Sequence, residues 1–258
     1  MNGTRLVSRV AAGLSSSFSD HFFTLDTRRT TCSCYWTMML RIRAALGTFL
    51  LVNPISGFVV SRGSRQSASH LFAESQLAQL ASITTLSIDS GDLNVIREYA
   101  DTGYITDATT NPLFVSQAGL NGDPVYVKMV DDAVAYALSQ NVGDETVTLA
   151  MDRLAVNLGK SISDIVQGYI STEVDPRLSF DTEASVQRGR RIIAMYEEMG
   201  VPKERILIKL AATWEGILAA EQLESEGIQC NLTLIFSVVQ AIACAQYNAH
   251  LISPFPGR

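Results

Sequence analysis

Hydrophobic residues recur every three or four positions in several segments of the chain, which is the spacing of helices with one buried face. Residues 125–139 place Val127, Val130, Val134 and Ala137 on one such face. The same pattern continues from residue 147 to residue 165, at Val147, Met151, Leu154, Leu158, Ile162 and Ile165. We predict a helix over each of these two segments.

Three further helices are predicted, two of them from capping residues. Asp181 is suited to cap a helix that ends at Gly200, where glycine can adopt a left-handed conformation. Thr213 is suited to cap the next helix, which ends before Gly227. A last helix is predicted over residues 238–247, so helices occupy most of the chain beyond residue 125.

Short hydrophobic runs rich in branched residues separate the helices. Their length and composition predict strands, and strands that alternate with helices form right-handed βαβ units with a parallel sheet. No GxGxxG or GxxxxGK[ST] motif follows any of them, which disfavours the nucleotide-binding doubly wound folds. The predicted strands cover residues 86–88, 105–109, 169–173, 206–210, 231–235 and 251–253.

Polar residues recur at the carboxyl ends of these six strands. They are Asp89, Thr110 with Asn111, Glu173, Lys209, Thr233 and Ser253. In (β/α)8 barrels the active site lies at this end of the strands. The pattern therefore predicts an α/β fold, a (β/α)8 TIM barrel of which about six of the eight strands are present.

Lys209 is one of only four lysines, and it lies inside the hydrophobic run ILIKLAA. Burial disfavours the charged ammonium form, and a neutral amine attacks carbonyl groups to form a Schiff base. The alternative is a lysine whose aliphatic stem reaches along the sheet to water. The residues alone leave both interpretations open.

The charge distribution divides the chain. Residues 1–73 contain eight arginines, no lysine and two acidic residues, a net charge of +6, whereas the remaining twelve basic and twenty-four acidic residues give residues 74–258 a net charge of −12. We therefore predict a targeting leader over residues 1–73 and a separate domain, the predicted barrel, over residues 74–258. The acidic domain has no basic cluster, so we expect no nucleic-acid partner.

The leader combines two kinds of targeting signal. A short apolar stretch over residues 44–52 follows the basic residues Arg41 and Arg43, as in a secretory signal, and it is too short to span a membrane stably. A segment rich in Ser and Arg follows, with no acidic residue before Glu74, as in organelle transit peptides. The combination resembles the bipartite leaders of secondary plastids. We expect a plastid location, with the cytoplasm as the alternative, and translation could also begin at Met38 or Met39.

Cysteine and histidine are too scattered to indicate a metal site. The four cysteines, at positions 32, 34, 230 and 244, form no CxxC motif, and His250 is the only histidine of residues 74–258. We therefore expect neither a zinc site nor a disulfide framework, and no cofactor.

Five segments together resemble the transaldolases. They are DATTNP (107–112), STEVD (171–175), ILIKLA (206–211), CNLTL (230–234) and ISPFPGR (252–258). The resemblance implies a barrel of the class I aldolase type that belongs to the non-oxidative pentose phosphate pathway. Such an enzyme moves a dihydroxyacetone unit from sedoheptulose 7-phosphate to glyceraldehyde 3-phosphate without a metal or an organic cofactor. We expect sugar phosphates as substrates and a homodimer as the full-length form.

The resemblance also implies catalytic roles. Lys209 would form the Schiff base, and Asp89 would exchange the proton of the donor hydroxyl during C–C cleavage. Glu173 would transfer protons during imine formation, together with Thr233 and a water molecule. Two carboxylates with separate duties suit this chemistry, because the amine must be neutral to attack and the imine protonated to accept electrons.

Five more residues would bind the sugar phosphate in such an enzyme. Uncharged side chains would hold the three-carbon unit, an aromatic ring would wall the pocket and an arginine would bind the phosphate. These residues are Asn111, Asn231, Ser253, Phe255 and Arg258.

Several of these residues also fit purely structural roles. Asp89 could cap a helix starting near Leu93, Asn111 with Pro112 could form a turn, and Glu173 or Asp175 could cap another turn. Thr233 is an ordinary strand residue, and Arg258 could be frayed. Further down the chain, Ala212 stands where the family commonly has serine.

The sequence stops directly after the sixth predicted strand, so strands seven and eight and a second phosphate-binding arginine are not included. From this we expect a fragment that is poorly soluble and nearly inactive, since open sheet edges favour aggregation. Two other functions remain open at this point. One is another Schiff-base sugar-phosphate aldolase, and the other is a non-catalytic remnant that binds sugar phosphates or a full-length partner subunit.

Overall fold

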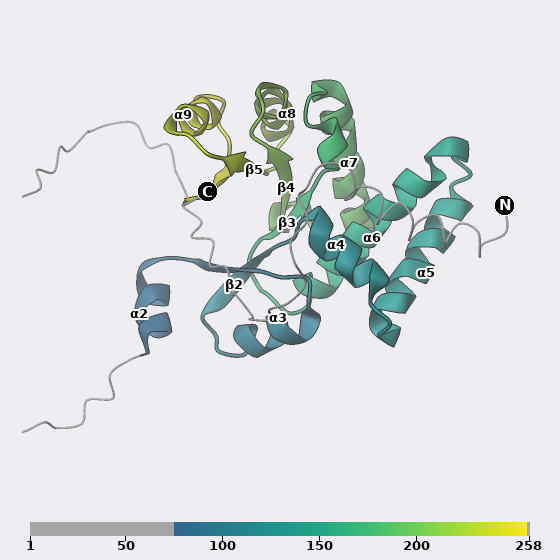
Figure 1. The fold of residues 1–258 in the computed structure, drawn as a ribbon, viewed down its shortest axis with the longest axis horizontal. Coiled ribbons are helices and arrows are strands. Elements are labelled where there is room, and N and C mark those ends of the chain that lie inside the picture. Colours follow the sequence, from purple (N-terminus) through teal and green to yellow (C-terminus); the bar gives the residue numbers. More distant parts are fainter. Residues whose placement is uncertain (1–74, 257–258) are drawn as a thin grey trace, which may run out of the picture.

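Six parallel strands form a single sheet in the computed structural model, which describes residues 75–256 (Figure 1). The strand order follows the sequence, so every crossover joins neighbouring strands. The leader, Cys32, Cys34 and Arg258 lie outside the described residues. The strands are β1 (Leu86–Asp89), β2 (Ile105–Thr109), β3 (Ile170–Glu173), β4 (Ile206–Ala211), β5 (Cys230–Ile235) and β6 (Leu251–Pro254).

The predicted fold is confirmed. Each predicted strand is present to within one residue at either end, and all five pairings are parallel. The sheet curls, and the crossover helices lie along its outer side, as expected for an incomplete (β/α)8 barrel (Figure 1). Within the described residues, β1 and β6 are the two edges of the sheet. The expected poor solubility stays a prediction.

The helices include two that the sequence pattern did not predict. One is α2, which has no buried residue, and the other is α4, which begins with proline directly after Asn111. Proline is well tolerated at the first position of a helix, so this Asn-Pro pair starts a helix as well as a turn. The helices are α2 (Gln76–Ile83), α3 (Leu93–Ala100), α4 (Pro112–Leu120), α5 (Pro124–Ser139), α6 (Thr146–Ser163), α7 (Thr182–Glu198), α8 (Trp214–Ser225) and α9 (Val238–Gln246). Short 3-10 turns cover Gly143–Glu145, Pro176–Leu178 and Lys203–Arg205.

The buried face of α5 agrees with the predicted one at Val130, Val134 and Ala137 but not at Val127. Val127 is 44% exposed, whereas its neighbours Tyr126 and Met129 are buried beside Val130. Adjacent positions on a helix point about 100° apart. A buried face that is predicted from the spacing of the valines alone can therefore include a position next to the one that is actually buried. The larger side chains bury more apolar surface and therefore decide which face packs inward.

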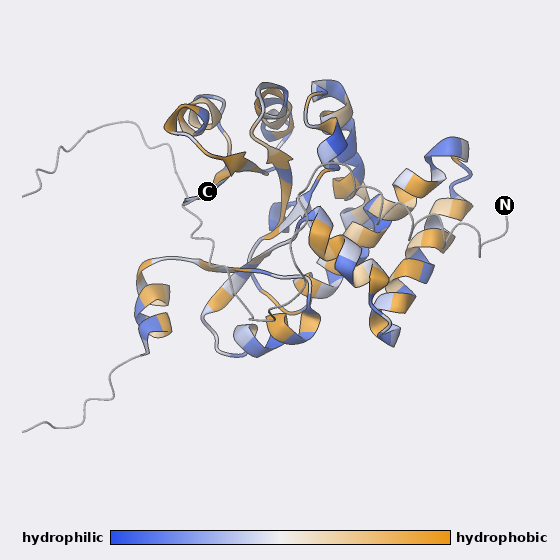
Figure 2. Cartoon of the chain, in the orientation of Figure 1, coloured by the Kyte–Doolittle hydropathy of each residue, from blue (hydrophilic) through white to orange (hydrophobic). Residues whose placement is uncertain are grey.

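Successive side chains of each strand point to opposite faces of the sheet, either toward the helices or toward the concave side. In β4, Ile206, Ile208 and Leu210 belong to the hydrophobic core under the helices, while Lys209 lies between them and points to the concave side. Figure 2 shows this strand and β5 as largely hydrophobic. The odd-numbered residues of β3, β4 and β5 therefore share the concave side of the sheet.

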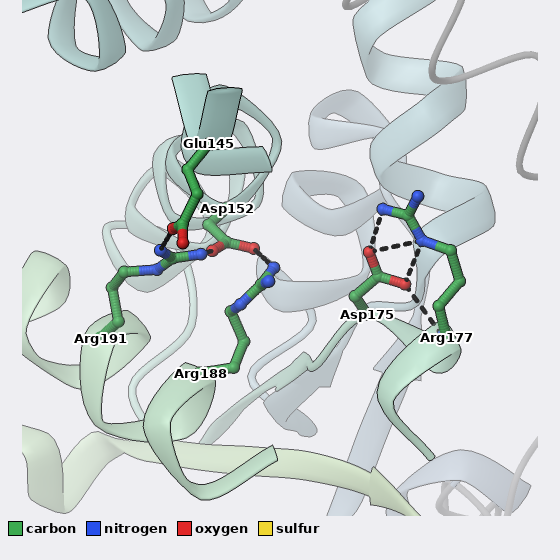
Figure 3. Close-up of polar contacts among 6 residues, drawn as sticks. All are labelled: Glu145, Asp152, Asp175, Arg177, Arg188 and Arg191. Atoms are coloured by element: carbon green, nitrogen blue, oxygen red, sulfur yellow. Dashed lines mark hydrogen bonds and ion pairs between the residues drawn. The ribbon is translucent and has the colours of Figure 1, made fainter. Parts of the chain in front are cut away.

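A buried carboxylate joins α6 to α7. Asp152 accepts a hydrogen bond from Arg188 at 2.9 Å and another from Arg191 at 2.5 Å, and Arg191 also contacts Glu145 at 3.2 Å (Figure 3). The Asp152 side chain is only 8% exposed. Because an isolated buried charge is costly, the two guanidinium groups compensate for the loss of water around it.

Gly159 on α6 leaves room for a buried tyrosine. The hydroxyl of Tyr196 hydrogen-bonds to Thr172 at 2.6 Å, and a Cβ at Gly159 would lie 1.7 Å from that hydroxyl oxygen. Gly159→Ala is therefore expected to destabilise the fold by about 1–3 kcal/mol, although alanine favours helices. Urea denaturation would measure this, with Gly122→Ala as the control, because a Cβ at Gly122 meets no atom within 4 Å. Equal stability of the two variants would contradict the packing described here.

None of the helices described between residues 75 and 256 combines the length and the hydrophobicity required to cross a membrane. Two cysteines in this part of the chain, Cys230 and Cys244, are buried and carry free thiols.

Candidate active site

Lys209 is buried on the concave side of the sheet, with 6% of its surface exposed. Its Nζ lies 3.3 Å from Oε2 of Glu173 and donates a hydrogen bond to the carbonyl oxygen of Thr110 at 3.2 Å. The lysine therefore does not reach along the sheet to water. It is also not isolated, because a carboxylate lies directly beside the amine.

Glu173 meets Lys209 because the two residues face each other across neighbouring strands. They are paired in the register of β3 and β4, and the Glu173 side chain is 11% exposed. Burial raises the pKa of Glu173, attraction to Lys209 opposes this shift, and the charge of Asp89 adds to it. A carboxyl group with a raised pKa beside an amine is suited to exchange a proton with it.

Asp89 ends β1 and faces the same amine. Burial raises the pKa of Asp89, and the positive charge of Lys209 partly opposes the shift. Its Oδ1 is buried and has no hydrogen-bond partner among the described residues. The alternative role of helix cap is excluded, because Asp92 caps α3 by accepting from the backbone of Asn94 and Val95.

A chain of hydrogen bonds runs across the floor of the site. The hydroxyl of Ser253 donates to Oδ1 of Asn231 at 2.7 Å, and Nδ2 of Asn231 donates to the hydroxyl of Ser171 at 3.0 Å. These contacts fix the orientation of the Asn231 amide. Ser171 was not among the predicted site residues, although it lies two positions before Glu173 and so shares its side of the strand.

Two more hydroxyl groups lie buried without a hydrogen-bond partner in the described part of the chain. They belong to Thr233, a predicted catalytic residue, and Ser87, which sequence reasoning did not select. An unsatisfied buried hydroxyl costs about 1–3 kcal/mol, so such groups are suited to receive water or a ligand.

The remaining predicted residues lie at the carboxyl ends of β2 and β6. Asn111 caps α4, since its side-chain oxygen accepts from the backbone of Phe114 at 3.0 Å. Asn111 therefore has a structural role, as the cap of a helix and not only as part of the turn that the sequence suggested. Phe255 is half-buried, and its ring lies 5.7 Å from that of Phe236. Arg258 lies outside the described residues, so its predicted role is untested.

The alternative cap proposed for the turn after β3 is formed by Asp175. This carboxylate accepts from the backbone of Arg177 and pairs with its guanidinium, which lowers the pKa of Asp175 even though burial opposes the shift (Figure 3). Glu173 is therefore left free to pair with Lys209.

Two surface hollows lie away from these residues. One, of 620 Å³, surrounds the start of β1 near Thr85 and Tyr104, and the other, of 540 Å³, lies beside Arg188 and Arg191. Neither is lined by a predicted site residue. Within residues 75–256, no group of three or more His, Cys, Asp or Glu side chains is arranged to hold a metal ion.

The sequence matches the family described as Transaldolase/Fructose-6-phosphate aldolase over residues 86–258. The chain is 54% identical over 185 residues to a transaldolase of Alteromonas mediterranea, which covers 71% of this chain and 56% of that protein. It is 50% identical over 185 residues to a transaldolase of Protochlamydia amoebophila, with 72% and 56% covered. A probable transaldolase of Dictyostelium discoideum is 51% identical over 184 residues, with 70% and 56% covered. The chain thus spans just over half the length of these relatives.

Proposed function

The chain belongs to the transaldolase/fructose-6-phosphate aldolase family, and we propose that it carries the Schiff-base chemistry of a transaldolase. The reaction would transfer a dihydroxyacetone unit from sedoheptulose 7-phosphate to glyceraldehyde 3-phosphate, within the non-oxidative pentose phosphate pathway. The observation that carries the proposal is the buried Lys209 amine, 3.3 Å from the Glu173 carboxylate.

The first stage is imine formation. Glu173 takes a proton from the Lys209 ammonium, and the neutral amine attacks C2 of the donor ketose. Glu173 then returns this proton to the former carbonyl oxygen, which gives a carbinolamine. A second proton passes from the carbinolamine nitrogen to the same oxygen through Glu173, the unpaired hydroxyl of Thr233 and a water molecule, so that water leaves and a protonated imine remains. The raised pKa of Glu173 favours the first of these transfers, because its carboxylate accepts the proton of the Lys209 ammonium more readily.

The second stage is cleavage. Asp89 removes the proton from the C4 hydroxyl, the C3–C4 bond breaks, and its electron pair passes to C3 and is delocalised into the imine. An aldehyde leaves, and a three-carbon enamine stays bound to Lys209. Asn231, held by Ser171 and Ser253, is suited to orient this fragment. Asn111, Phe255 and Arg258 complete the proposed contacts, with Arg258 on the phosphate.

Borohydride reduction in the presence of fructose 6-phosphate tests the proposal, because it converts an imine into a stable amine. Although we expect little turnover from this chain, borohydride traps the imine without repeated turnover. We therefore expect a covalent adduct on the peptide that contains Lys209, and complete loss of the adduct in Lys209→Met. Lys128→Met is the control, since Lys128 is 73% exposed and lies far from the sheet on α5. No adduct in the parent chain, or an adduct on another lysine, would contradict the proposal.

The family description also includes fructose-6-phosphate aldolase activity. The two reactions differ in the fate of the three-carbon unit, which an aldolase releases as free dihydroxyacetone and a transaldolase passes to an acceptor aldehyde. Measuring free dihydroxyacetone with and without glyceraldehyde 3-phosphate separates them. A chain that binds sugar phosphate but never forms the adduct would be the non-catalytic remnant.

Two further proposals rest on the sequence. Import into a plastid rests on the composition of residues 1–73, and a homodimeric full-length form rests on the resemblance to the family.

A further inference from the structure

The loop between β1 and α3 determines where Asp89 lies. It consists of residues 90–92, and its internal hydrogen bonds hold only its own backbone. Ser90 Oγ accepts from the backbone of Asp92 at 3.1 Å, and Asp92 caps α3. Neither contact attaches the loop to the rest of the barrel.

Tyr126 on α5 makes that attachment. Its hydroxyl accepts a hydrogen bond from the backbone of Leu93 at 2.9 Å and donates one to the carbonyl oxygen of Gly91 at 3.2 Å. One buried oxygen therefore ties both sides of Asp92 to a helix more than thirty residues away in the sequence. The Leu93 amide belongs to the first turn of α3, where no helical carbonyl can accept it.

The loop also packs against α4. A Cβ at Gly91 would lie 2.8 Å from Cβ of Phe114 and 3.3 Å from its carbonyl oxygen, so the loop backbone is in close contact with this helix. Asn111 caps the same helix. The loop is thus held between α4 and the Tyr126 hydroxyl, and it links the strand of Asp89 to the helix of Asn111.

The carboxylate of Asp89 lies at the end of β1, two residues before Gly91. Its buried Oδ1 has no hydrogen-bond partner in the part of the chain that the structure describes, so no side-chain contact of that oxygen fixes it. The charges that face Asp89 are those of Lys209 and Glu173. We infer that the Tyr126 hydroxyl is a positioning group for Asp89, which holds the β1–α3 loop in the geometry needed for C–C cleavage. This role rests on the proposed function of Asp89.

Tyr126→Phe removes the hydroxyl and keeps the ring. After borohydride reduction in the presence of fructose 6-phosphate, an uncleaved imine gives a six-carbon adduct on Lys209, and a cleaved one gives a three-carbon adduct. We expect the variant to form the imine at the parent rate but to cleave it ~10- to ~100-fold more slowly, because small displacements of a catalytic group are costly. The six-carbon adduct should therefore accumulate, as mass spectrometry of the quenched peptide would reveal.

Tyr136→Phe is the matched control. Tyr136 lies on the same helix, and its hydroxyl also makes a hydrogen bond, to Glu198 at 3.1 Å on the surface. The control should give the parent ratio of adducts. Equal cleavage by Tyr126→Phe and the parent would overturn the inference, and so would a parallel loss of both adducts, which a merely structural role would produce.

Absence of any adduct in the parent would contradict the proposed function but would not test the role of Tyr126. A second measurement tests that role without an adduct. The carboxyl carbon signal of Asp89, followed by NMR across a pH titration, reports on the distance of Asp89 from Lys209 and Glu173. Tyr126→Phe should shift its midpoint and Tyr136→Phe should not. An unchanged midpoint in both variants would overturn the positioning role of Tyr126.

Discussion

Asp89→Asn should stop C–C cleavage while Lys209 continues to form the imine. Asparagine has nearly the same shape as aspartate but cannot accept the C4 hydroxyl proton. Loss of a general base typically slows a reaction by about 10²- to 10⁴-fold. After borohydride reduction the variant should therefore carry almost only the six-carbon adduct on Lys209, whereas the parent carries the three-carbon adduct.

The control for this substitution is Asp92→Asn. Asp92 lies three positions away and caps α3, and asparagine caps helices about as well as aspartate, so cleavage should be retained. In the parent, the cleavage rate should fall as pH decreases through the pKa of Asp89, because only the carboxylate accepts a proton. Burial places that pKa above its ordinary value of 3.8. A three-carbon adduct formed by Asp89→Asn at the parent rate would exclude Asp89 as the base.

The sheet could be predicted from sequence because its signals are local. Each strand is a short run of branched residues that ends in a polar residue, and the run ILIKLA appears in the structure as β4 with Lys209 on the side opposite the three core residues. Helix α4 could not be predicted in the same way. Its first residues, Asn111 and Pro112, fit a turn and a helix start equally well, and packing against α5 and α6 decides between them.

The candidate site was only partly predictable for a different reason. Lys209 carries a charge inside a hydrophobic run, and Glu173 and Asp89 carry charges at the ends of predicted strands, which makes all three visible in the sequence. Ser171 and Tyr126 have no such signal, since serine and tyrosine are common in strands and helices. Their importance comes from contacts 60 and 35 residues away, to Asn231 and Gly91, which only the folded chain brings together.

Separate removal of either charge in the Lys209–Glu173 pair should destabilise the fold far more than removal of both. Lys209→Met leaves a buried carboxylate without a partner, and Glu173→Gln leaves a buried ammonium in the same position. Breaking a buried pair in this way typically costs about 3–5 kcal/mol, whereas replacement of both partners by neutral groups is often close to neutral. Urea denaturation of the parent, the two single variants and the double variant would measure the coupling, provided that the slope with urea is unchanged.

A surface pair provides the control. Lys128 and Asp132 lie 2.6 Å apart with side chains 73% and 55% exposed, so the same set of variants should change stability by at most about 1 kcal/mol. Small effects of both single substitutions at Lys209 and Glu173 would mean that water reaches this pair as well.

The pH dependence of stability tests whether Glu173 is the carboxyl group that binds its proton more tightly in the folded chain. The pKa of Glu173 in the fold lies above its ordinary value of 4.5, so the folded chain holds this proton more tightly than the unfolded chain does. Stability from this group is therefore greatest below pH 4.5 and is lost as pH rises through the folded pKa. Lys209→Met removes the attraction that opposes the rise in the pKa of Glu173. The loss of stability with rising pH should therefore become larger and extend to higher pH in this variant. Glu173→Gln should abolish it, because a glutamine has no proton to release, and persistence of the loss in that variant would assign it to another group.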